Sequence, residues 1–406
     1  MITVDEALSL IDASINNLGT EQISIENSCG RVLATDIVAR YDLPTFTQSA
    51  MDGFAINFEE TINATQDNPV KFEIDGEVYA TVSIKLERIE KGKTVKIYTG
   101  VSLPVGTNAV VVKEEAKIEG NNLLVYRKVK PWENVRIAGE EVKKGTLLIN
   151  KGTKLTPGIL AILASQGYSQ IEVFRRPNIA IITTGNEVVR LTETLHLGQV
   201  YNINEIFLCS FFKSRGYNIT YIQHVPDQIT NLIGTIQRAM QKANVIITTG
   251  GVSVGDKDLV KSAAKSWEFK EIFWRIAQKP GKPLYFAKRN NIYLFGLPGN
   301  PASAFICFII YGIHLLEKLE GVSLPYPCYN YGILNKSITP DPNKTMWVRC
   351  GLEYTKEGKA ILEPLPKQAS HMITNLTNTR VIARIEPHTT PLQEGTVVSY
   401  VNLPFF

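Results

Sequence analysis

The stretch Ile246–Asp258 reads I-I-T-T-G-G-V-S-V-G-D-K-D, and a related stretch lies on each side of it in the chain. These are I-I-T-T-G-N-E at Ile181–Glu187 and F-G-L-P-G-N-P at Phe295–Pro301. Each passes from a short apolar run, typical of a buried strand, into a glycine turn. Segments with helical patterning lie between the strands, and this alternation indicates a mostly parallel sheet with helices on both faces. We therefore predict an α/β domain over residues 177–326.

In an open parallel sheet, the turns that follow the strands gather outside their carboxyl ends, where ligands bind. Glycines there let the backbone approach a phosphate, and a following helix N-terminus favours negative charge. Tight turns need glycine for their own geometry, which is the alternative, but three such turns on one sheet favour a binding site. The candidate binding residues in these turns are Gly185, Gly250, Gly251, Ser253, Gly255, Pro298, Gly299 and Asn300.

Carboxylates accompany two of the turns. Helix capping explains Asp256 well, and it is the alternative for Glu187 and Asp258. Carboxylates beside a phosphate site commonly hold Mg²⁺, which takes oxygen ligands and bridges phosphate oxygens. The sequence therefore predicts a Mg²⁺ site formed by Glu187 and Asp258.

A cationic loop follows, with the sequence R-I-A-Q-K-P-G-K-P. Its charges are Arg275, Lys279 and Lys282, and two prolines restrict its conformation. A solvated surface would explain any single lysine. Around a Pro-Gly turn beside the same sheet, we expect a site for an oxyanion.

The segment Gly251–Gly255 also matches the G-x-S-x-G turn of α/β-hydrolases, in which Ser253 would be the nucleophile. His314, for example, lies downstream, but we expect it to be a core histidine because it is inside an apolar helix. Acids follow Ser253 closely, and their charge would oppose the formation of an alkoxide. Hydrolysis is therefore kept only as an alternative.

The rest of the chain is β-rich or mixed. Short β-type runs separated by turns predict a β-module at residues 44–141. We interpret it as an insertion in one helical or mixed domain, made of residues 1–43 and 142–176. A second small β-domain is predicted at residues 327–406.

The composition excludes several classes of protein. Apolar residues make up 44% of the 406 residues, so large cores can form. Lysine and arginine (43) barely exceed aspartate and glutamate (39), which argues against nucleic-acid binding. The longest apolar stretch, Ala304–Ile313, is about ten residues, short of a membrane span. With no leader-like N-terminus and no Cys/His metal motif, we expect a soluble cytoplasmic protein that binds neither nucleic acid nor membrane.

Further motifs resemble a known family. S-A-M-D-G-F-A, T-G-V-S-L-P-V-G and R-I-A-G-E-E-V occur in that order before the three glycine turns. K-P-G-K-P and G-L-P-G-N-P-A-S complete the set. Together they resemble molybdopterin molybdenumtransferase, the MoeA family that includes the gephyrin E domain. The resemblance covers essentially the whole chain.

The resemblance implies an elongated homodimer whose chain has four structural units, the last of them β-barrel-like. It also implies a reaction in which molybdate is inserted into adenylylated molybdopterin, with Mg²⁺, to give molybdenum cofactor and AMP. The adenylyltransferase that supplies this substrate is a possible partner.

Position by position, the resemblance also implies functional residues. The acids and hydroxyl expected in the chemistry are Asp52, Thr99, Glu141, Glu187, Asp227 and Asp258. The groups expected near the molybdate or phosphate anion are Arg275, Lys279, Lys282, Arg349 and Ser370. The chain departs from the family pattern at Asn186, where an acid is usual, at Glu141, where aspartate is common, and at Arg275, where lysine is common. Asp227 is also well placed to cap the helix that follows it.

Two further alternatives remain. An adenylyltransferase of the same fold uses similar T-T-G and G-G-x-S motifs, but the inserted module with Asp52 argues against it. A scaffold that clusters membrane receptors, as gephyrin does, would bring a long linker and a second catalytic domain, which this sequence does not show.

Overall fold

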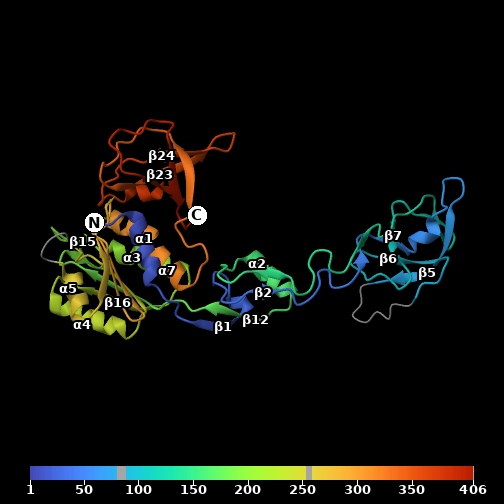
Figure 1. Ribbon diagram of the computed structural model, residues 1–406, viewed down its shortest axis with the longest axis horizontal. Coiled ribbons are helices and arrows are strands. Elements are labelled where there is room, and N and C mark those ends of the chain that lie inside the picture. Colours follow the sequence, from blue (N-terminus) through green and yellow to red (C-terminus); the bar gives the residue numbers. More distant parts are fainter. Residues whose placement is uncertain (80–87, 253–257, 406) are drawn as a thin grey trace. The chain divides into compact units, whose positions relative to one another are not determined.

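The computed structural model describes residues 1–79, 88–252 and 258–405 (Figure 1). Within these residues the chain forms two compact units. The first contains residues 1–35, 151–157 and 170–406, and the second contains residues 36–150 and 158–169. The division into four domains remains a proposal.

A six-stranded sheet lies at the centre of the first unit. Its order is β16 (Ile219–Val225), β13 (Ile179–Thr184), β17 (Val245–Thr249), β21 (Ile292–Leu297), β20 (Tyr285–Arg289) and β18 (Lys270–Trp274). The first four strands are parallel, whereas β20 and β18 pair antiparallel at one edge. The predicted mostly parallel sheet is thus confirmed.

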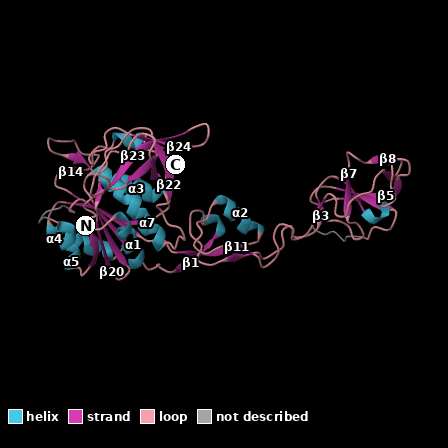
Figure 2. Ribbon diagram, turned by 45° about the horizontal axis from the view of Figure 1, so that its top comes forward, coloured by secondary structure: helices cyan, strands magenta, loops and turns pink. Residues whose placement is uncertain are grey.

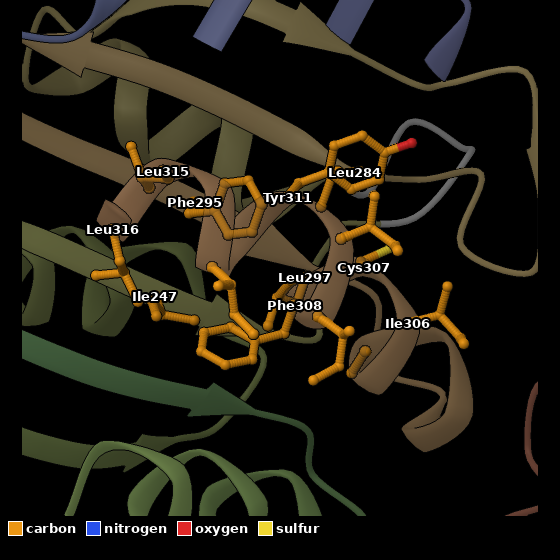
Figure 3. Close-up of a cluster of buried hydrophobic side chains, with 14 of the residues drawn as sticks. Ile247, Leu284, Phe295, Leu297, Ile306, Cys307, Phe308, Tyr311, Leu315 and Leu316 are labelled. Atoms are coloured by element: carbon orange, nitrogen blue, oxygen red, sulfur yellow. The ribbon is translucent and has the colours of Figure 1, made fainter. Parts of the chain in front are cut away.

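Helices cover both faces of this sheet (Figure 2). They are α3 (Ile203–Ser214), α4 (Ile229–Met240), α5 (Leu259–Ser266), α6 (Pro301–Cys307) and α7 (Ile313–Leu319). Alternate residues of each strand point to opposite faces, so Ile181 and Ile247 join one core while Ile182 and Ile246 join the other. Figure 3 shows part of the first core, which includes Phe295, Phe308 and Leu316.

The helical run Pro301–Leu319 is longer than the apolar stretch suggested, because a π-turn at Phe308–Gly312 joins α6 to α7. By length and composition alone this run is apolar enough to cross a membrane. However, 89% of its most apolar 18-residue window is buried inside the protein, as in a core helix.

The first helix, α1 (Val4–Ser14), begins with the capping box that Thr3 and Glu6 form. Its apolar residues Val4, Ala7 and Ile11 are fully buried in the core of the α/β sheet. The sequence interpretation grouped residues 1–43 with residues 142–176, and that division stays a proposal. Periodicity shows that a helix has an apolar stripe but does not show which surface covers it.

The remaining part of the first unit contains mostly strands. β1 (Thr20–Ser24) pairs with β12 (Gln170–Phe174), and β14 (Val188–Val189) pairs with β15 (Val200–Tyr201). The C-terminal sheet has the order β19 (Gln278–Lys279), β23 (Thr345–Tyr354), β24 (Ala360–Pro364), β22 (Tyr329–Leu334), β26 (Val397–Asn402) and β25 (Val381–Ile385). Because β25 also pairs with β23, the sheet closes on itself, which confirms the predicted barrel-like domain.

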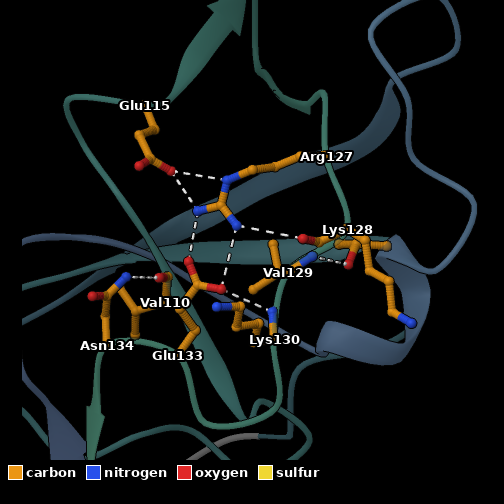
Figure 4. A network of polar contacts seen from close by, with 9 residues as sticks. Val110, Glu115, Arg127, Lys128, Val129, Lys130, Glu133 and Asn134 are labelled. Carbon is orange, nitrogen blue, oxygen red and sulfur yellow. Dashed lines mark hydrogen bonds and ion pairs between the residues drawn. The ribbon is translucent and has the colours of Figure 1, made fainter.

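The second unit contains the inserted β-module. Its sheet has the order β7 (Ala109–Val112), β4 (Gly53–Ile56), β6 (Lys93–Ile97), β5 (Val70–Val78), β9 (Asn122–Val125) and β8 (Lys117–Glu119). The unit also contains β2 (Ile37–Val38), β3 (Gln48–Ser49), β10 (Val135–Arg136), β11 (Leu147–Ile149) and nearly all of α2 (Pro157–Ser165). Figure 4 shows how Arg127 connects two loops, since its Nη2 lies 2.5 Å from Glu115 Oε2 and 2.6 Å from Glu133 Oε1.

Candidate functional site

The three glycine turns of the first unit meet at the carboxyl ends of β13, β17 and β21. A Cβ on Gly250, whose φ is +85°, would lie 2.7 Å from both the carbonyl oxygen and Oγ1 of Thr184. A Cβ on Gly299 would lie 3.5 Å from the Cα of Gly250. Only glycine fits at position 250, whereas the Gly299 distance shows that the third turn lies against the second. The structure therefore brings the turns together at one place.

Thr184 is a site residue that the sequence reasoning missed. Its side chain is 6% exposed, and among the described residues its Oγ1 has no hydrogen-bond partner. A Cβ on Gly251 would lie 3.3 Å from the same oxygen. A buried hydroxyl without a partner costs free energy, so a ligand that bonded it would recover that cost. The signal was present in the repeated T-T-G motif, which we interpreted through its glycine alone.

Asp258 lies at the start of α5, behind the second turn. Its Oδ1 accepts a hydrogen bond of 3.0 Å from the Lys261 backbone and caps the helix. The residue is 7% exposed, and its Oδ2 has no partner among the described residues. Burial raises the pKa of Asp258, although the Lys261 backbone bond and the charges of Lys261 and Arg275 oppose that shift. A buried carboxylate with one free oxygen is suited to a cation.

Glu187 and Asp227 are exposed acids beside the first turn. The Glu187 carboxylate folds back over the turn, since a Cβ on Gly185 would lie 3.0 and 3.1 Å from its oxygens. The prediction that Asp227 caps α4 is wrong, because the N-cap is Gln228, without a side-chain bond. The Asp227 backbone N–H donates instead to Asn186 Oδ1 at 3.1 Å. Asn186, where the family usually has an acid, thus connects these two loops.

The buried side chain of Gln278, which is 1% exposed, supports the cationic loop. Its Nε2 donates to the Gly281 carbonyl at 2.9 Å, and its Oε1 accepts from Tyr311 at 2.7 Å and Trp347 at 2.8 Å. Lys279, the next residue, is exposed. The loop therefore presents a cation at its surface while a buried amide fixes its backbone.

Arg275 begins the same loop with a backbone φ of +69°, which is uncommon outside glycine. Its guanidinium carbon lies 3.6 Å from the centre of the Trp274 ring, a cation–π contact. Arg275 also contributes to the electrostatic environment of Asp258. The charge of Arg275 thus lowers the pKa of one of the predicted acids, as the smallest of the effects that act on it.

Arg349 has a different environment. It is 1% exposed, and its guanidinium donates to the carbonyls of Met372 at 2.5 Å, Lys367 at 2.9 Å and Ala369 at 3.4 Å. Its Nε donates to Gln368 Oε1 at 3.3 Å. These bonds use the guanidinium group that we expected to bind an anion. In this geometry Arg349 shapes the segment that carries Ser370.

Hydrogen bonds connect the start of α6 to Ser370. The Asn300 side chain donates to Ser370 Oγ at 3.0 Å, and the Ala302 backbone donates to the Ser370 carbonyl at 3.0 Å. Asn204 donates to the Gly299 carbonyl at 2.9 Å. The structure thus brings Ser370 to the third glycine turn.

In the second unit, Asp52 and Thr99 form a pair at one end of the sheet. Asp52 Oδ1 accepts from the Thr99 backbone N–H at 2.9 Å and from its hydroxyl at 3.0 Å. These bonds, with a smaller effect from Lys113 at 3.7 Å, lower the pKa of Asp52. The next residue, Gly53, cannot carry a side chain, because a Cβ would lie 2.0 Å from the Val111 carbonyl oxygen. The sequence therefore fixes the backbone beside Asp52.

Glu141 and His314 are two further residues that the sequence singled out. Glu141 is exposed, and its backbone N–H donates to the Leu43 carbonyl at 3.0 Å. Ser253, Gly255 and Asp256 lie outside the described residues. His314 is a core histidine, as expected, with Asp12 Oδ1 at 2.8 Å and the Tyr326 carbonyl at 2.7 Å.

Across residues 1–79, 88–252 and 258–405, no group of three or more histidine, cysteine, aspartate or glutamate residues could hold a metal ion. Mg²⁺ does not require such a cage, since it is commonly bound by one or two carboxylates together with substrate phosphates. The free Oδ2 of Asp258 fits that mode of binding.

Comparison with known proteins identifies the family. Residues 2–167 match the MoeA N-terminal region (domain I and II), residues 180–318 match a probable molybdopterin binding domain, and residues 331–403 match the MoeA C-terminal region (domain IV). The chain belongs to the MoeA family. The resemblance and the enzyme class predicted from it are confirmed at the level of that family.

Individual members of the MoeA family align along nearly the whole chain. The molybdopterin molybdenumtransferase of Staphylococcus epidermidis is 30% identical over 98% of this chain and 95% of its own length. That of Bacillus subtilis is 30% identical over 98% and 93%, respectively. The crystal structure of the molybdopterin biosynthesis MoeA protein of Pyrococcus horikoshii has a TM-score of 0.84 at 28% identity, covering 99% of this chain and all of that one.

Proposed function

We propose that this protein inserts molybdate into adenylylated molybdopterin in an Mg²⁺-dependent reaction that yields molybdenum cofactor and AMP. Curated relatives that align along nearly the whole chain carry the name molybdopterin molybdenumtransferase. The observation that carries the proposal is the meeting of Thr184, Gly250 and Gly299, with the buried carboxylate of Asp258 behind them. Backbone approach, a free hydroxyl and a free carboxylate oxygen together suit a phosphate-containing substrate.

Each part of the site has a role in this proposal. The glycine turns and the Thr184 hydroxyl bind the phosphates of the substrate. Molybdate is a compact dianion, so Lys279, Lys282 and Arg275 attract it, and Ser370 supplies a hydroxyl donor. Holding the anion and the pterin dithiolene in fixed positions lowers the entropic part of the barrier.

Asp258 and Glu187 would hold Mg²⁺, whose chemistry is to neutralise phosphate charge as AMP leaves. Asp258 contributes a buried oxygen that has no partner among the described residues, and Glu187 contributes an exposed carboxylate beside Gly185. In the second unit, the Asp52 carboxylate is ionised at neutral pH, and its hydrogen bonds from Thr99 hold it in place for contact with substrate. We also propose a homodimer in the cytoplasm, supplied with substrate by an adenylyltransferase.

The test is to incubate the purified protein with adenylylated molybdopterin, molybdate and Mg²⁺, and to measure AMP release. We expect AMP release that depends on both molybdate and Mg²⁺, together with the appearance of molybdenum cofactor. AMP release without any dependence on molybdate would contradict the proposal. Light scattering of the same preparation would give the oligomeric state.

A further inference from the structure

Two tyrosines, the exposed Tyr79 and the half-buried Tyr98, lie at the same end of the second unit's sheet as Asp52 and Thr99. Tyr79 follows the last residue of β5, and Tyr98 follows the last residue of β6. The two strands are parallel neighbours, and Val78 is paired with Ile97, so the tyrosines emerge side by side. Their rings are stacked, with centroids 5.3 Å apart and an interplanar angle of 18°.

This tyrosine pair is continuous with the Asp52–Thr99 contact. Thr99 is the residue after Tyr98, and it donates both its N–H and its hydroxyl to Asp52. Gly53, the residue after Asp52, is paired with Ile97 across β4 and β6. One sheet end therefore carries two aromatic rings, a hydroxyl and an ionised carboxylate.

Hydrogen bonds to Glu77 fix the hydroxyl groups of both rings. Glu77 accepts a hydrogen bond from the Tyr79 hydroxyl at 2.5 Å and another from the Tyr98 hydroxyl. Lys96, paired with Glu77 across β5 and β6, lies 2.7 Å from the same carboxylate. Tyr98 is half-buried against the core of this unit, and Tyr79, which is 56% exposed, stacks on it. Because both hydroxyls are fixed, Tyr79 presents an ordered ring to solvent with Tyr98 behind it.

We propose that Tyr79 and Tyr98 form a stacking platform for a planar, nitrogen-rich aromatic ring of the substrate that Asp52 and Thr99 contact. Adenine and pterin share this ring chemistry, and the substrate of the proposed function contains both, so the inference rests on that function. Stacking of such rings on aromatic side chains contributes affinity and does not depend on which hydrogen-bonding groups the ring carries. The ordered pair is preorganised, because little side-chain entropy remains to be lost on binding.

The experiment measures binding separately from turnover. Adenosine and unsubstituted pterin are each titrated into the full-length protein by calorimetry, with wild type, Tyr79→Leu and Tyr98→Leu. Tyr354→Leu is the matched control, since Tyr354 is 65% exposed but belongs to the first unit. We expect both platform variants to lose about fivefold to a hundredfold in affinity for at least one probe, and the control to lose none.

The identity of the probe that loses affinity distinguishes the two rings: adenosine alone places adenine on the platform, and pterin alone places the pterin there. Unchanged affinity for both probes, or no binding of either to wild type, overturns the proposal. Should a leucine variant fail to fold, nitration of wild-type Tyr79 and Tyr98 is compared with and without saturating probe. Protection supports the platform, and its absence overturns it.

AMP release by wild type is assayed in parallel. Normal AMP release with tyrosine variants that bind as wild type does would reject the platform and leave the proposed function intact. Tyrosine-dependent ring binding by a wild type that releases no AMP would reject the proposed function and leave the platform intact.

Discussion

The Asn300 amide nitrogen lies 3.0 Å from the Ser370 hydroxyl oxygen and donates a hydrogen bond to it. The two residues are 70 positions apart and come from different parts of the first unit, the start of α6 and a loop after β24. A second bond, from the Ala302 backbone to the Ser370 carbonyl, fixes the same contact. Packing between the α/β sheet and the C-terminal barrel therefore determines the position of the Ser370 hydroxyl.

This contact predicts the effect of Asn300→Ala. The variant should require several-fold more molybdate for half-maximal AMP release, because Ser370 loses the bond that orients its hydroxyl. Stability should fall by only about 1 kcal/mol, the usual net value of one hydrogen bond. Asn218→Ala is the control, since that exposed amide bonds Asn178 at the amino end of β13, opposite the glycine turns. Wild-type molybdate dependence in Asn300→Ala would contradict the positioning role.

Asp258→Asn should separate activity from stability. Asparagine caps helices as well as aspartate does, so the cap of α5 survives while the charge is removed. We expect AMP release to fall by about a hundredfold or more. Asp258→Ala is the comparison, because it also loses the cap, at a cost of about 1 kcal/mol. Chemical unfolding at pH 7 and an AMP assay give both quantities.

The sign of the stability change follows from the pKa. Burial raises the pKa of Asp258 in the folded protein above its value in the unfolded chain. Folding stability therefore declines as pH rises from the unfolded pKa through the folded one, and the full penalty is present at pH 7. Asp258→Asn should be as stable as wild type at pH 7, or more stable. A clear loss of stability there would mean that the carboxylate has a partner that stabilises its charge.

Local chemistry decided what the sequence could predict. The glycine turns were found because a strand followed by glycine is a local signal, and the capping box at Thr3 and Glu6 is equally local. The capping prediction for Asp227 failed by one residue, since α4 begins after Gln228. Short-range patterns fix the elements but leave their ends uncertain.

Long-range packing decided what the sequence could not predict. Nothing in its neighbours along the chain shows that Arg349 is buried under the carbonyls of Lys367 and Met372. Nor does periodicity show that α1 covers the α/β core through Ile11. Thr184 was missed because a free buried hydroxyl is defined only by its surroundings in three dimensions.

Gln278→Leu tests the support of the cationic loop. It leaves the Tyr311 hydroxyl and the Trp347 indole N–H buried without an acceptor, so we expect a loss of about 2–4 kcal/mol in stability. Because the bond to Gly281 is also lost, the molybdate concentration for half-maximal turnover should rise. Tyr311→Phe is the control, since it removes one bond and keeps the loop contact. Equal kinetic effects in both variants would reject the loop-positioning explanation.

Thr99→Val and Thr99→Ser form a matched pair. Valine keeps the shape but removes the hydroxyl that bonds Asp52, whereas serine keeps the hydroxyl. With one donor fewer, the pKa of Asp52 should rise towards its ordinary value, so the carboxylate protonates at higher pH. The acid limb of the pH–rate profile should therefore move to higher pH in Thr99→Val and stay near wild type in Thr99→Ser. Identical profiles for wild type and both variants would contradict a role of the Thr99 hydroxyl in the site.

The last prediction contrasts two cations that the sequence placed in one group, Lys279 and Arg349. Lys279 is exposed, and a methionine at its position should leave the free energy of unfolding within about 0.5 kcal/mol of wild type. Its loss should nevertheless raise the molybdate concentration needed for turnover, because an accessible charge near the anion path has been removed. Both measurements use the same purified variant, titrated with molybdate and unfolded in urea.

Arg349→Met should behave in the opposite way. The carbonyls of Lys367, Ala369 and Met372 would lose their donor inside a site that is 1% exposed, and each unsatisfied acceptor costs about 1–3 kcal/mol. We therefore expect a loss of several kcal/mol in stability, together with reduced binding of every ligand that meets Ser370. Arg349→Lys should recover little, because an ammonium cannot reproduce the planar fork that reaches several carbonyls at once. If Arg349→Met were stable and weakened molybdate alone, the guanidinium would have to leave these carbonyls and meet the anion directly.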